Sequence, residues 1–322
     1  MIKNNFSILI LVAFFFVACE KEEIPVAAHN PGSTIASSVF MQSDYSSQLY
    51  FDLETNKMIQ QNHKTIWDLG FETSEAGNKV VLNTSKLMYA ANTQQTNFAN
   101  VTDTVGLTFK WDAASGNLDS TAIGDWTANN VYVIDRGLDE LGTHQGFSKI
   151  EFLAVNTSEY TVHFANLDGS NDKTMNITKD ADYNLAFLSL NGNTVSVAPP
   201  NENWDLSFTQ YTNIFYDETP ITPYVVAGCL SNRNKVEVAQ VFDKEFENIV
   251  LDDVNNYGFS TAVDAIGYAW KEYDFNTSSY IIFSAKNYII KSTEGKYYKL
   301  HFIDFYDDLG VKGTPTFEFQ EL

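Results

Sequence analysis

The sequence predicts an all-β protein, predominantly antiparallel, with few short helices and two related β-units. Three features support this prediction. Short runs rich in β-branched and aromatic residues recur along the chain, turn-forming residues separate them, and one pattern is repeated at a fixed offset. Hydrophobic residues make up 44% of the chain, which supplies a large core and excludes intrinsic disorder.

The first residues have the layout of a secretory signal peptide. Lys3 is followed by an uncharged, apolar run over residues 4–18 that is too short to cross a bilayer. Small Ala18 directly precedes Cys19, which resembles the lipobox of Bacteroidetes lipoproteins. We therefore predict that residues 1–18 are removed and that Cys19 is lipidated, although an ordinary cleaved signal with an incidental cysteine is the alternative.

The segment after Cys19 predicts a surface location. Residues 20–23 read Glu-Lys-Glu-Glu and resemble the signal that exports Bacteroidetes lipoproteins to the outer face of the outer membrane. Residues 19–33 contain Pro25, Pro31 and Gly32 and are expected to form a flexible tether. The folded part would span residues 34–322 and contact the membrane through the lipid anchor only.

The net charge and the cysteine content exclude nucleic-acid binding and an intrachain disulfide. With 41 acidic and 20 basic side chains the formal charge is −21, which repels phosphate backbones and excludes nucleic-acid binding. Lipidation of Cys19 leaves Cys229 without an intrachain partner, so no disulfide is expected. Cys229 lies in an apolar stretch and is predicted to be a small buried hydrophobic residue.

The predicted strands follow one another with short turns between them. They cover residues 48–53, 79–82, 131–134, 149–155, 160–164, 184–190, 194–197, 204–208, 280–283, 288–291, 297–302 and 316–319. Turn chemistry separates them, as at Asn191-Gly192-Asn193. Residues 243–250 and 260–266 are the better helix candidates, and both are short.

An internal repeat supports the two β-units. Residues 67–71, Trp-Asp-Leu-Gly-Phe, recur 137 positions later as Trp-Asp-Leu-Ser-Phe at residues 204–208. Upstream, residues 50–53 correspond to 187–190 at the same offset. The Trp, Leu and Phe are expected to fill a core, and the Asp to hold a neighbouring turn by hydrogen bonds. This repeat predicts two possible sub-units, at about residues 34–170 and 171–322.

No motif of an enzyme is present in the sequence. The chain has no H-E-x-x-H, G-x-S-x-G, P-loop, G-x-G-x-x-G or C-x-x-C pattern. Adjacent acidic pairs such as Asp252-Asp253 and Asp307-Asp308 are typical of solvated loops. We predict a binding protein without catalytic residues.

The C-terminal part resembles the closing hairpin of the HmuY family, lipoproteins of Bacteroidetes whose founding member is a haem-scavenging haemophore. Residues 288–306 and 310–320 carry this resemblance, joined by residues 50–71, 224–230 and 266–274. The resemblance implies a predominantly antiparallel β fold and, for characterised members, haem held between axial His or Met side chains.

The axial ligands cannot be transferred by position, because residues 176–300 contain neither His nor Met. His144 and Met88 are the candidate haem ligands, since both are expected in loops that can project a side chain into a cleft. The remaining candidates, which are more often packing or surface residues, are His63, His163, His301, Met58 and Met175.

The sequence is therefore interpreted as an outer-membrane, surface-exposed lipoprotein that binds haem or another porphyrin for iron acquisition. Its partner would be a TonB-dependent transporter in the outer membrane. The alternative is an envelope lipoprotein that keeps the fold, has lost the haem site, and binds a glycan or a protein.

Overall fold

The computed structural model describes residues 31–126 and 129–322. The predicted signal peptide, the lipidation site at Cys19 and most of the tether lie outside the described residues. Within the described ranges, no helix is long and apolar enough to cross a bilayer. Gly32–Leu322 form one compact unit.

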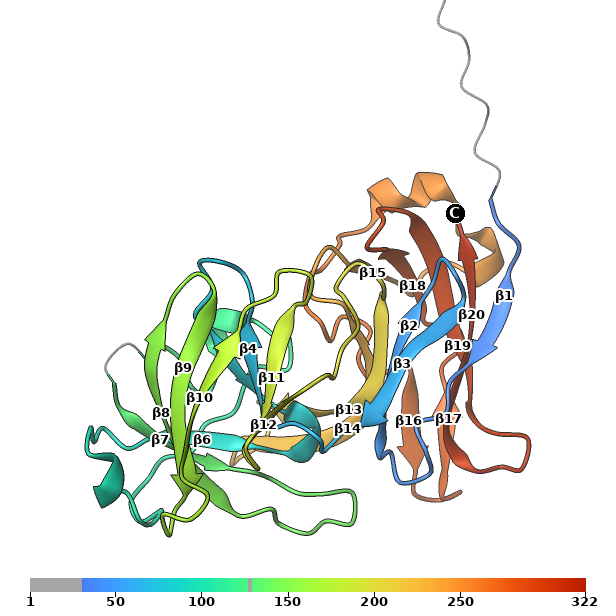
Figure 1. The fold of residues 1–322 in the computed structure, drawn as a ribbon. Coiled ribbons are helices and arrows are strands. Elements are labelled where there is room, and N and C mark those ends of the chain that lie inside the picture. The colour runs from blue at the N-terminus through green and yellow to red at the C-terminus, as the bar shows by residue number, and fades with distance from the viewer. Residues whose placement is uncertain (1–30, 127–128) are drawn as a thin grey trace, which may run out of the picture. The chain divides into compact units, whose positions relative to one another are not determined.

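Strands dominate the described part of the chain (Figure 1). They are β1 (Ile35–Ser38), β2 (Ser47–Asp52), β3 (Lys57–His63), β4 (Leu69–Glu72), β5 (Val80–Leu82), β6 (Tyr89–Asn92), β7 (Val131–Asp135), β8 (Phe147–Val155), β9 (Glu159–Asn166), β10 (Lys173–Thr178), β11 (Leu185–Ser189), β12 (Asn193–Val195), β13 (Leu206–Phe215), β14 (Thr222–Ser231), β15 (Glu237–Val241), β16 (Lys271–Asp274), β17 (Ser279–Ile282), β18 (Asn287–Lys291), β19 (Tyr297–Tyr306) and β20 (Lys312–Glu321). Every strand that the sequence predicted overlaps one of these.

Short 3₁₀ helices complete the fold: η1 (Thr84–Lys86), η2 (Phe98–Asn100), η3 (Leu118–Ser120), η4 (Phe246–Asn248) and η5 (Leu251–Asn256). The predicted helix at residues 243–250 is reduced to η4. The predicted helix at residues 260–266 is wrong, because Ser260 forms a β-bridge with Val238 and the Val263 carbonyl accepts from the Ser231 N–H. Tertiary pairing has overridden the local preference of this segment.

The strands form two pairs of matching sheets, and the strand pairings of the described residues are antiparallel. One pair comprises the five-stranded sheets β10-β9-β8-β7-β6 and β1-β20-β19-β18-β15. The other comprises the four-stranded sheets β12-β11-β4-β5 and β3-β2-β13-β14. Strands β16 and β17 form a separate hairpin. The predicted all-β, antiparallel fold is confirmed.

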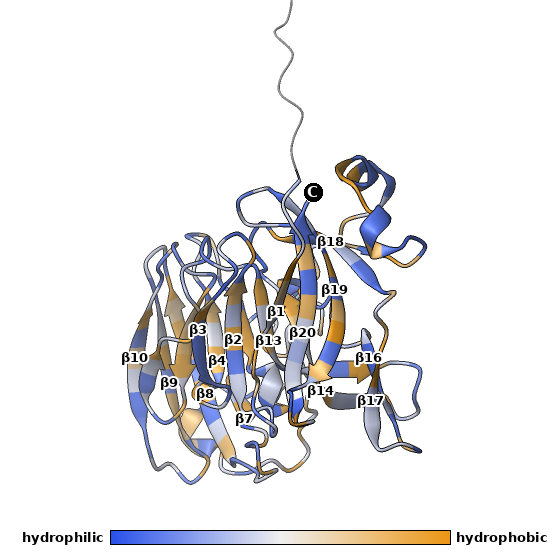
Figure 2. Ribbon diagram, turned by 90° about the vertical axis from the view of Figure 1, so that its right-hand side faces the viewer, coloured by the Kyte–Doolittle hydropathy of each residue, from blue (hydrophilic) through white to orange (hydrophobic). Residues whose placement is uncertain are grey.

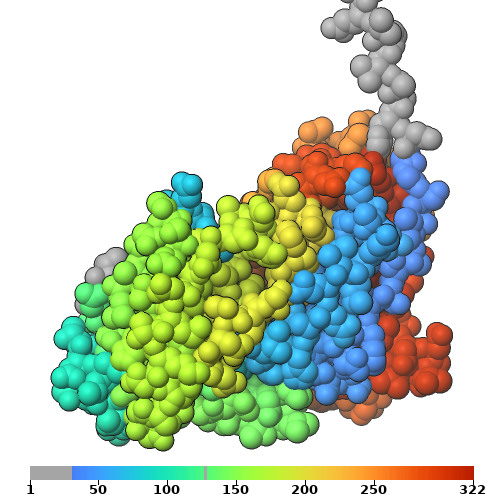
Figure 3. All heavy atoms as spheres, in the orientation of Figure 1, coloured from blue at the N-terminus to red at the C-terminus, as the bar shows by residue number. Residues whose placement is uncertain are grey.

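The repeats exchange strands. β4 of the first repeat pairs with β11 of the second, with Leu69 opposite Leu188. β13 of the second repeat pairs with β2 of the first, with Leu206 opposite Phe51. The register of the two pairs is the same after a shift of 137 residues. The two halves of the sequence, which meet near residue 170, therefore contribute strands to the same sheets. Figure 3 shows the N-terminal strands in blue directly against yellow and red atoms of the second half.

The repeated aspartates stabilise this exchange, as the sequence predicted. Asp68 Oδ2 accepts a hydrogen bond from the Leu190 N–H at 2.7 Å. Asp205 Oδ2 accepts one from the Leu53 N–H at 3.0 Å. Each aspartate thus binds the turn that belongs to the other repeat.

The repeated tryptophans pack across the exchange in the same way. Trp67 lies 4.8 Å from Phe187 and Trp204 lies 4.8 Å from Tyr50, measured between ring centres. The Leu and Phe of both motifs are buried, which confirms their predicted core role. Figure 2 shows hydrophobic and hydrophilic bands along the strands, as expected where one face of a sheet is buried.

Candidate functional site

The two repeats match closely enough that their differences can be located. Asn83 Nδ2 donates to the carbonyls of Lys64 and Trp67. Asn232 Nδ2 donates to the carbonyls of Asn201 and Trp204. The two asparagines are therefore equivalent, yet they are 149 positions apart, whereas the two tryptophans are 137 apart. The β13–β14 hairpin is thus 12 residues longer than the β4–β5 hairpin.

A second difference precedes the next strand. Trp126 packs on Phe152 with ring centres 5.0 Å apart, and Trp270 stacks on Phe302 at 3.9 Å. Strand β7 begins five positions after Trp126, but β18 begins 17 positions after Trp270. The additional 12 residues of the second repeat are the β16–β17 hairpin.

The third difference lies in the β19–β20 hairpin. Lys149 and Lys299 are equivalent, since the first donates to the carbonyls of η2 and its C-cap and the second does the same at η4. Lys149 lies opposite Ala165, 16 positions later, and Lys299 lies opposite Gln320, 21 positions later. This hairpin is five residues longer in the second repeat.

All three extensions line one cavity of about 1160 Å³. This volume lies somewhat above the roughly 300–1,000 Å³ found for small-molecule sites. We call it the tyrosine cavity, because its lining includes Tyr45, Tyr224, Tyr268, Tyr273, Tyr280 and Tyr306, together with Phe215 and Phe275. The charged residues that line it are Glu218, Lys271, Glu272 and Lys312.

The tyrosines form a connected wall. The Tyr280 N–H donates to the Tyr306 hydroxyl at 2.7 Å, and Lys312 Nζ lies 4.7 Å above the ring centre of Tyr45. Burial raises the pKa of Tyr45 and of Tyr280. Both hydroxyls are therefore protonated at neutral pH, and the wall offers flat aromatic faces rather than negative charge.

The three extended hairpins carry exposed apolar side chains. Phe275, at the tip of the β16–β17 hairpin, lines the tyrosine cavity and is 86% exposed. Leu309, in the β19–β20 turn, is 88% exposed, and Tyr216, just beyond β13, is 66% exposed. Each of the three extended hairpins thus places a large hydrophobic side chain in solvent.

The predicted haem ligands do not line the tyrosine cavity. Met88 is 3% exposed and packs in the core with Phe71 and Phe152, so the prediction that it projects from a loop into a cleft is wrong. Its apolar side chain gains more by burial than a surface position allows. His144 is exposed in its loop, with Nε2 2.7 Å from Asp135 Oδ1. Its role as a ligand stays a prediction.

The other candidates have local partners. His163 lies between Glu151 and Asp172, His301 contacts Glu318, and His63 lies 3.5 Å from Glu140. Met58 is exposed on β3, and Met175 packs against the core. Cys229 is fully buried, as predicted. In the described part of the chain, no three His, Cys, Asp or Glu residues are grouped to hold a metal ion.

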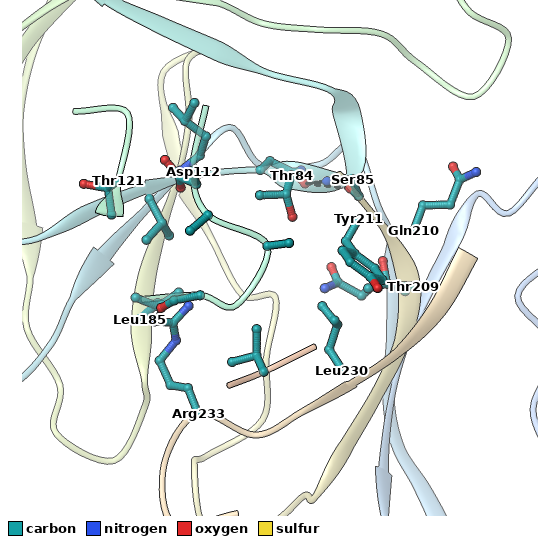
Figure 4. Close-up of a pocket in the computed structure, with 18 of the residues that line it drawn as sticks. Thr84, Ser85, Asp112, Thr121, Leu185, Thr209, Gln210, Tyr211, Leu230 and Arg233 are labelled. Carbon is teal, nitrogen blue, oxygen red and sulfur yellow. Dashed lines mark hydrogen bonds between the residues drawn. The ribbon is translucent and has the colours of Figure 1, made fainter. Parts of the chain in front are cut away.

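A smaller cavity of about 120 Å³ lies between the repeats (Figure 4). Figure 4 shows Asp112 and Arg233 on one side of it, across from Tyr211. Burial raises the pKa of Asp112 to about 6, and both of its carboxylate oxygens accept backbone N–H groups. The carboxylate of Asp112 thus binds the backbone at Leu82 and Ala122, so we place the candidate site in the tyrosine cavity.

No sequence motif marks this site, although the sequence does contain a signal for it. The cavity residues carry no catalytic or metal-binding pattern, and aromatic residues are frequent throughout the chain. Only the unequal spacing of equivalent positions marks the extended hairpins, and that equivalence depends on the hydrogen bonds of Asn83 and Asn232.

A protein-family model and several solved structures are similar to this chain. A model of the HmuY protein family matches residues 44–319. No curated protein matches the chain. Similar solved structures include apo PinO of Porphyromonas gingivitis, with 10% identity and a TM-score of 0.36 over 90% of this chain and 97% of that one. Another is the apo HmuY analog of Tannerella forsythia, with 11% identity and a TM-score of 0.26 over 91% of this chain and 98% of that one.

The family match covers β2 to β19 and most of β20, and it includes all three extended hairpins. This chain belongs to the HmuY family.

Proposed function

We propose that this protein is a surface lipoprotein that binds haem or a related porphyrin in the tyrosine cavity and is not an enzyme. One observation carries the proposal: the three hairpins that distinguish the second repeat from the first all line the same aromatic cavity. Strand pairing and core packing are satisfied without these extensions in the first repeat. Their retention in the second is best explained by a ligand.

The lining of the cavity suits a flat, largely apolar ligand. Aromatic faces can cover a porphyrin macrocycle, and buried tyrosine hydroxyls can hydrogen-bond its polar groups. Of the side chains that commonly ligate haem iron, namely His, Cys, Met and Tyr, only Tyr lines the cavity. Tyrosine would therefore hold the iron, if the ligand is haem.

The N-terminal end of the folded domain lies away from the tyrosine cavity, an arrangement that favours capture of a ligand at a membrane surface. The Gly32 N–H donates to the Glu321 carbonyl at the end of β20, whereas Lys312 at the start of β20 lines the cavity. The two points are the ends of the ten-residue strand β20, roughly 30 Å apart at about 3.3 Å per residue step. A lipid anchor at Cys19 would leave the cavity free to pass its ligand to an outer-membrane transporter of the TonB-dependent class.

Titration of residues 24–322 with haemin, followed by absorbance, tests the proposal. We expect a saturable Soret shift at one equivalent. The shift should disappear when Lys271–Ile282 are deleted and Trp270 is joined to Phe283, an arrangement close to that of the first repeat. Circular dichroism and thermal unfolding of the deletion variant check that the sheets remain.

The His144→Ala variant is the matched control and should bind haemin like the parent chain. A Soret band that survives the deletion but is lost in His144→Ala would place the ligand elsewhere and overturn the proposal. A flat response of the parent chain would favour the second candidate function, binding of a glycan or protein. The exposed Phe275 of the lining, and the absence of His and Met from that lining, support that alternative.

A further inference from the structure

Lys271 is the most unusual charged residue near the tyrosine cavity. It is the first residue of the inserted β16–β17 hairpin and is only 6% exposed. Its Nζ lies 4.3 Å from the ring centre of Trp270, 4.7 Å from that of Phe305 and 5.6 Å from that of Tyr280. The ammonium group is thus surrounded by aromatic rings at the wall of a ligand cavity.

The hydrogen bonds of this lysine are incomplete. An ammonium group has three N–H donors, and Lys271 donates one of them to the Ala227 carbonyl. No carboxylate of the described residues lies within ion-pair distance of Lys271; the neighbouring Glu272 is exposed. Burial lowers the pKa of Lys271 to about 7. A buried charge without a counter-ion is costly, and such conflicts occur mainly where a ligand completes the site.

Four other lysines of the described residues are buried, and they show what a structural lysine looks like in this fold. Lys86 is paired with Asp68 at 2.5 Å, Lys149 and Lys299 each donate to two carbonyls, and Lys64 donates to Gln210. None of the four lines the tyrosine cavity. Lys271 alone among the buried lysines combines burial in a cage of aromatic rings with contact with the cavity.

We propose that Lys271 binds a carboxylate of the ligand, so that the tyrosine cavity selects planar aromatic acids over their neutral analogues. This inference rests on the proposed function and names the chemical class of its ligand. The other charged residues of the lining, Lys312, Glu218 and Glu272, are all exposed, so Lys271 is the buried charge of the cavity wall. The charge buried in the wall is therefore positive in a protein whose net charge is −21.

Metal-free protoporphyrin IX, which has two carboxylates, and its dimethyl ester, which has none, separate this inference from iron ligation. Both are titrated against residues 24–322 in the same dilute detergent, with porphyrin fluorescence as the readout. A charged hydrogen bond is worth enough that the parent chain should prefer the acid by about tenfold or more. Lys271→Met should remove most of this preference and leave the affinity for the ester within about twofold.

Lys286→Met is the matched control. Lys286 also donates to a carbonyl, that of Ala269, and lies 4.9 Å from the ring centre of Phe283, but it does not line the cavity. This variant should keep the preference of the parent chain. An unchanged acid preference in Lys271→Met, or equal binding of acid and ester by the parent chain, overturns the role of Lys271 and leaves porphyrin binding intact. Failure of the parent chain to bind either porphyrin overturns the proposed function and this inference with it.

Discussion

The repeated aspartates, Asp68 and Asp205, occupy equivalent positions and have different electrostatic surroundings. Asp68 contacts two cations, with Oδ1 2.5 Å from Lys86 Nζ and Oδ2 2.9 Å from Arg136 Nη2. Asp205 has no cation within ion-pair distance in the described structure and accepts instead from the N–H and hydroxyl of Thr293. Burial raises the pKa of Asp205.

This difference shows which parts of the motif the fold requires. Both aspartates bind the backbone of the exchanged turn, so the backbone contact is common to the two repeats. The cations are an addition of the first repeat. The second repeat differs mainly in its three extended hairpins, where it builds the tyrosine cavity.

The largest effect on stability is expected at Asp68. Asp68→Asn would leave the buried Lys86 and the partly buried Arg136 without this counter-charge, which costs about 3–5 kcal/mol. Asp205→Asn removes hydrogen bonds only and should cost about 1–3 kcal/mol. Urea unfolding of both variants of residues 24–322 measures the difference. Equal costs would show that the cations contribute nothing and that the backbone contact alone matters.

A smaller and symmetric effect is expected at the equivalent lysines, Lys149 and Lys299. Each donates to two carbonyls and lies 4.7 Å from the ring centre of a phenylalanine. Methionine at either position removes both of these hydrogen bonds and should cost about 1–3 kcal/mol. The double variant should show additive costs to within about 0.5 kcal/mol, since the two sites share no partner. A clear departure from additivity would indicate that the two five-stranded sheets are coupled.

The smallest effect is a pH dependence at His163. Burial lowers its pKa, but hydrogen bonds to Glu151 and Asp172 outweigh burial and raise it above the ordinary value. A raised histidine pKa stabilises the fold below the unfolded value and loses this contribution as pH rises through the folded value. His163→Gln should therefore destabilise more at pH 5 than at pH 8 in thermal unfolding. Asp172→Asn should reduce this difference, and a pH-independent cost would contradict the assignment.

Much of the fold could be predicted from local chemistry. Alternating apolar residues predicted the strands, and the repeated Trp-Asp-Leu motif predicted both the core residues and the turn contact of its aspartate. The residues of the C-terminal hairpin were sufficient to suggest the HmuY family, which the match over residues 44–319 confirms. These features depend on neighbours in sequence or on short repeated patterns.

The strand exchange and the site depended on contacts between distant residues. Leu69 pairs with Leu188 and Leu206 with Phe51, and nothing in either half specifies that its partner strand comes from the other half. Met88 was expected in a cleft and is instead enclosed by the core, because the chain around it packs against strands more than 60 positions away.

The amino-acid sequence thus determined the strands, the repeat and the family, because periodicity and side-chain type act locally. The tertiary structure decided which strands pair and where the tyrosine cavity forms. Three separate hairpins meet at this cavity only after the sheets have assembled, and Lys271 acquires its aromatic surroundings only there.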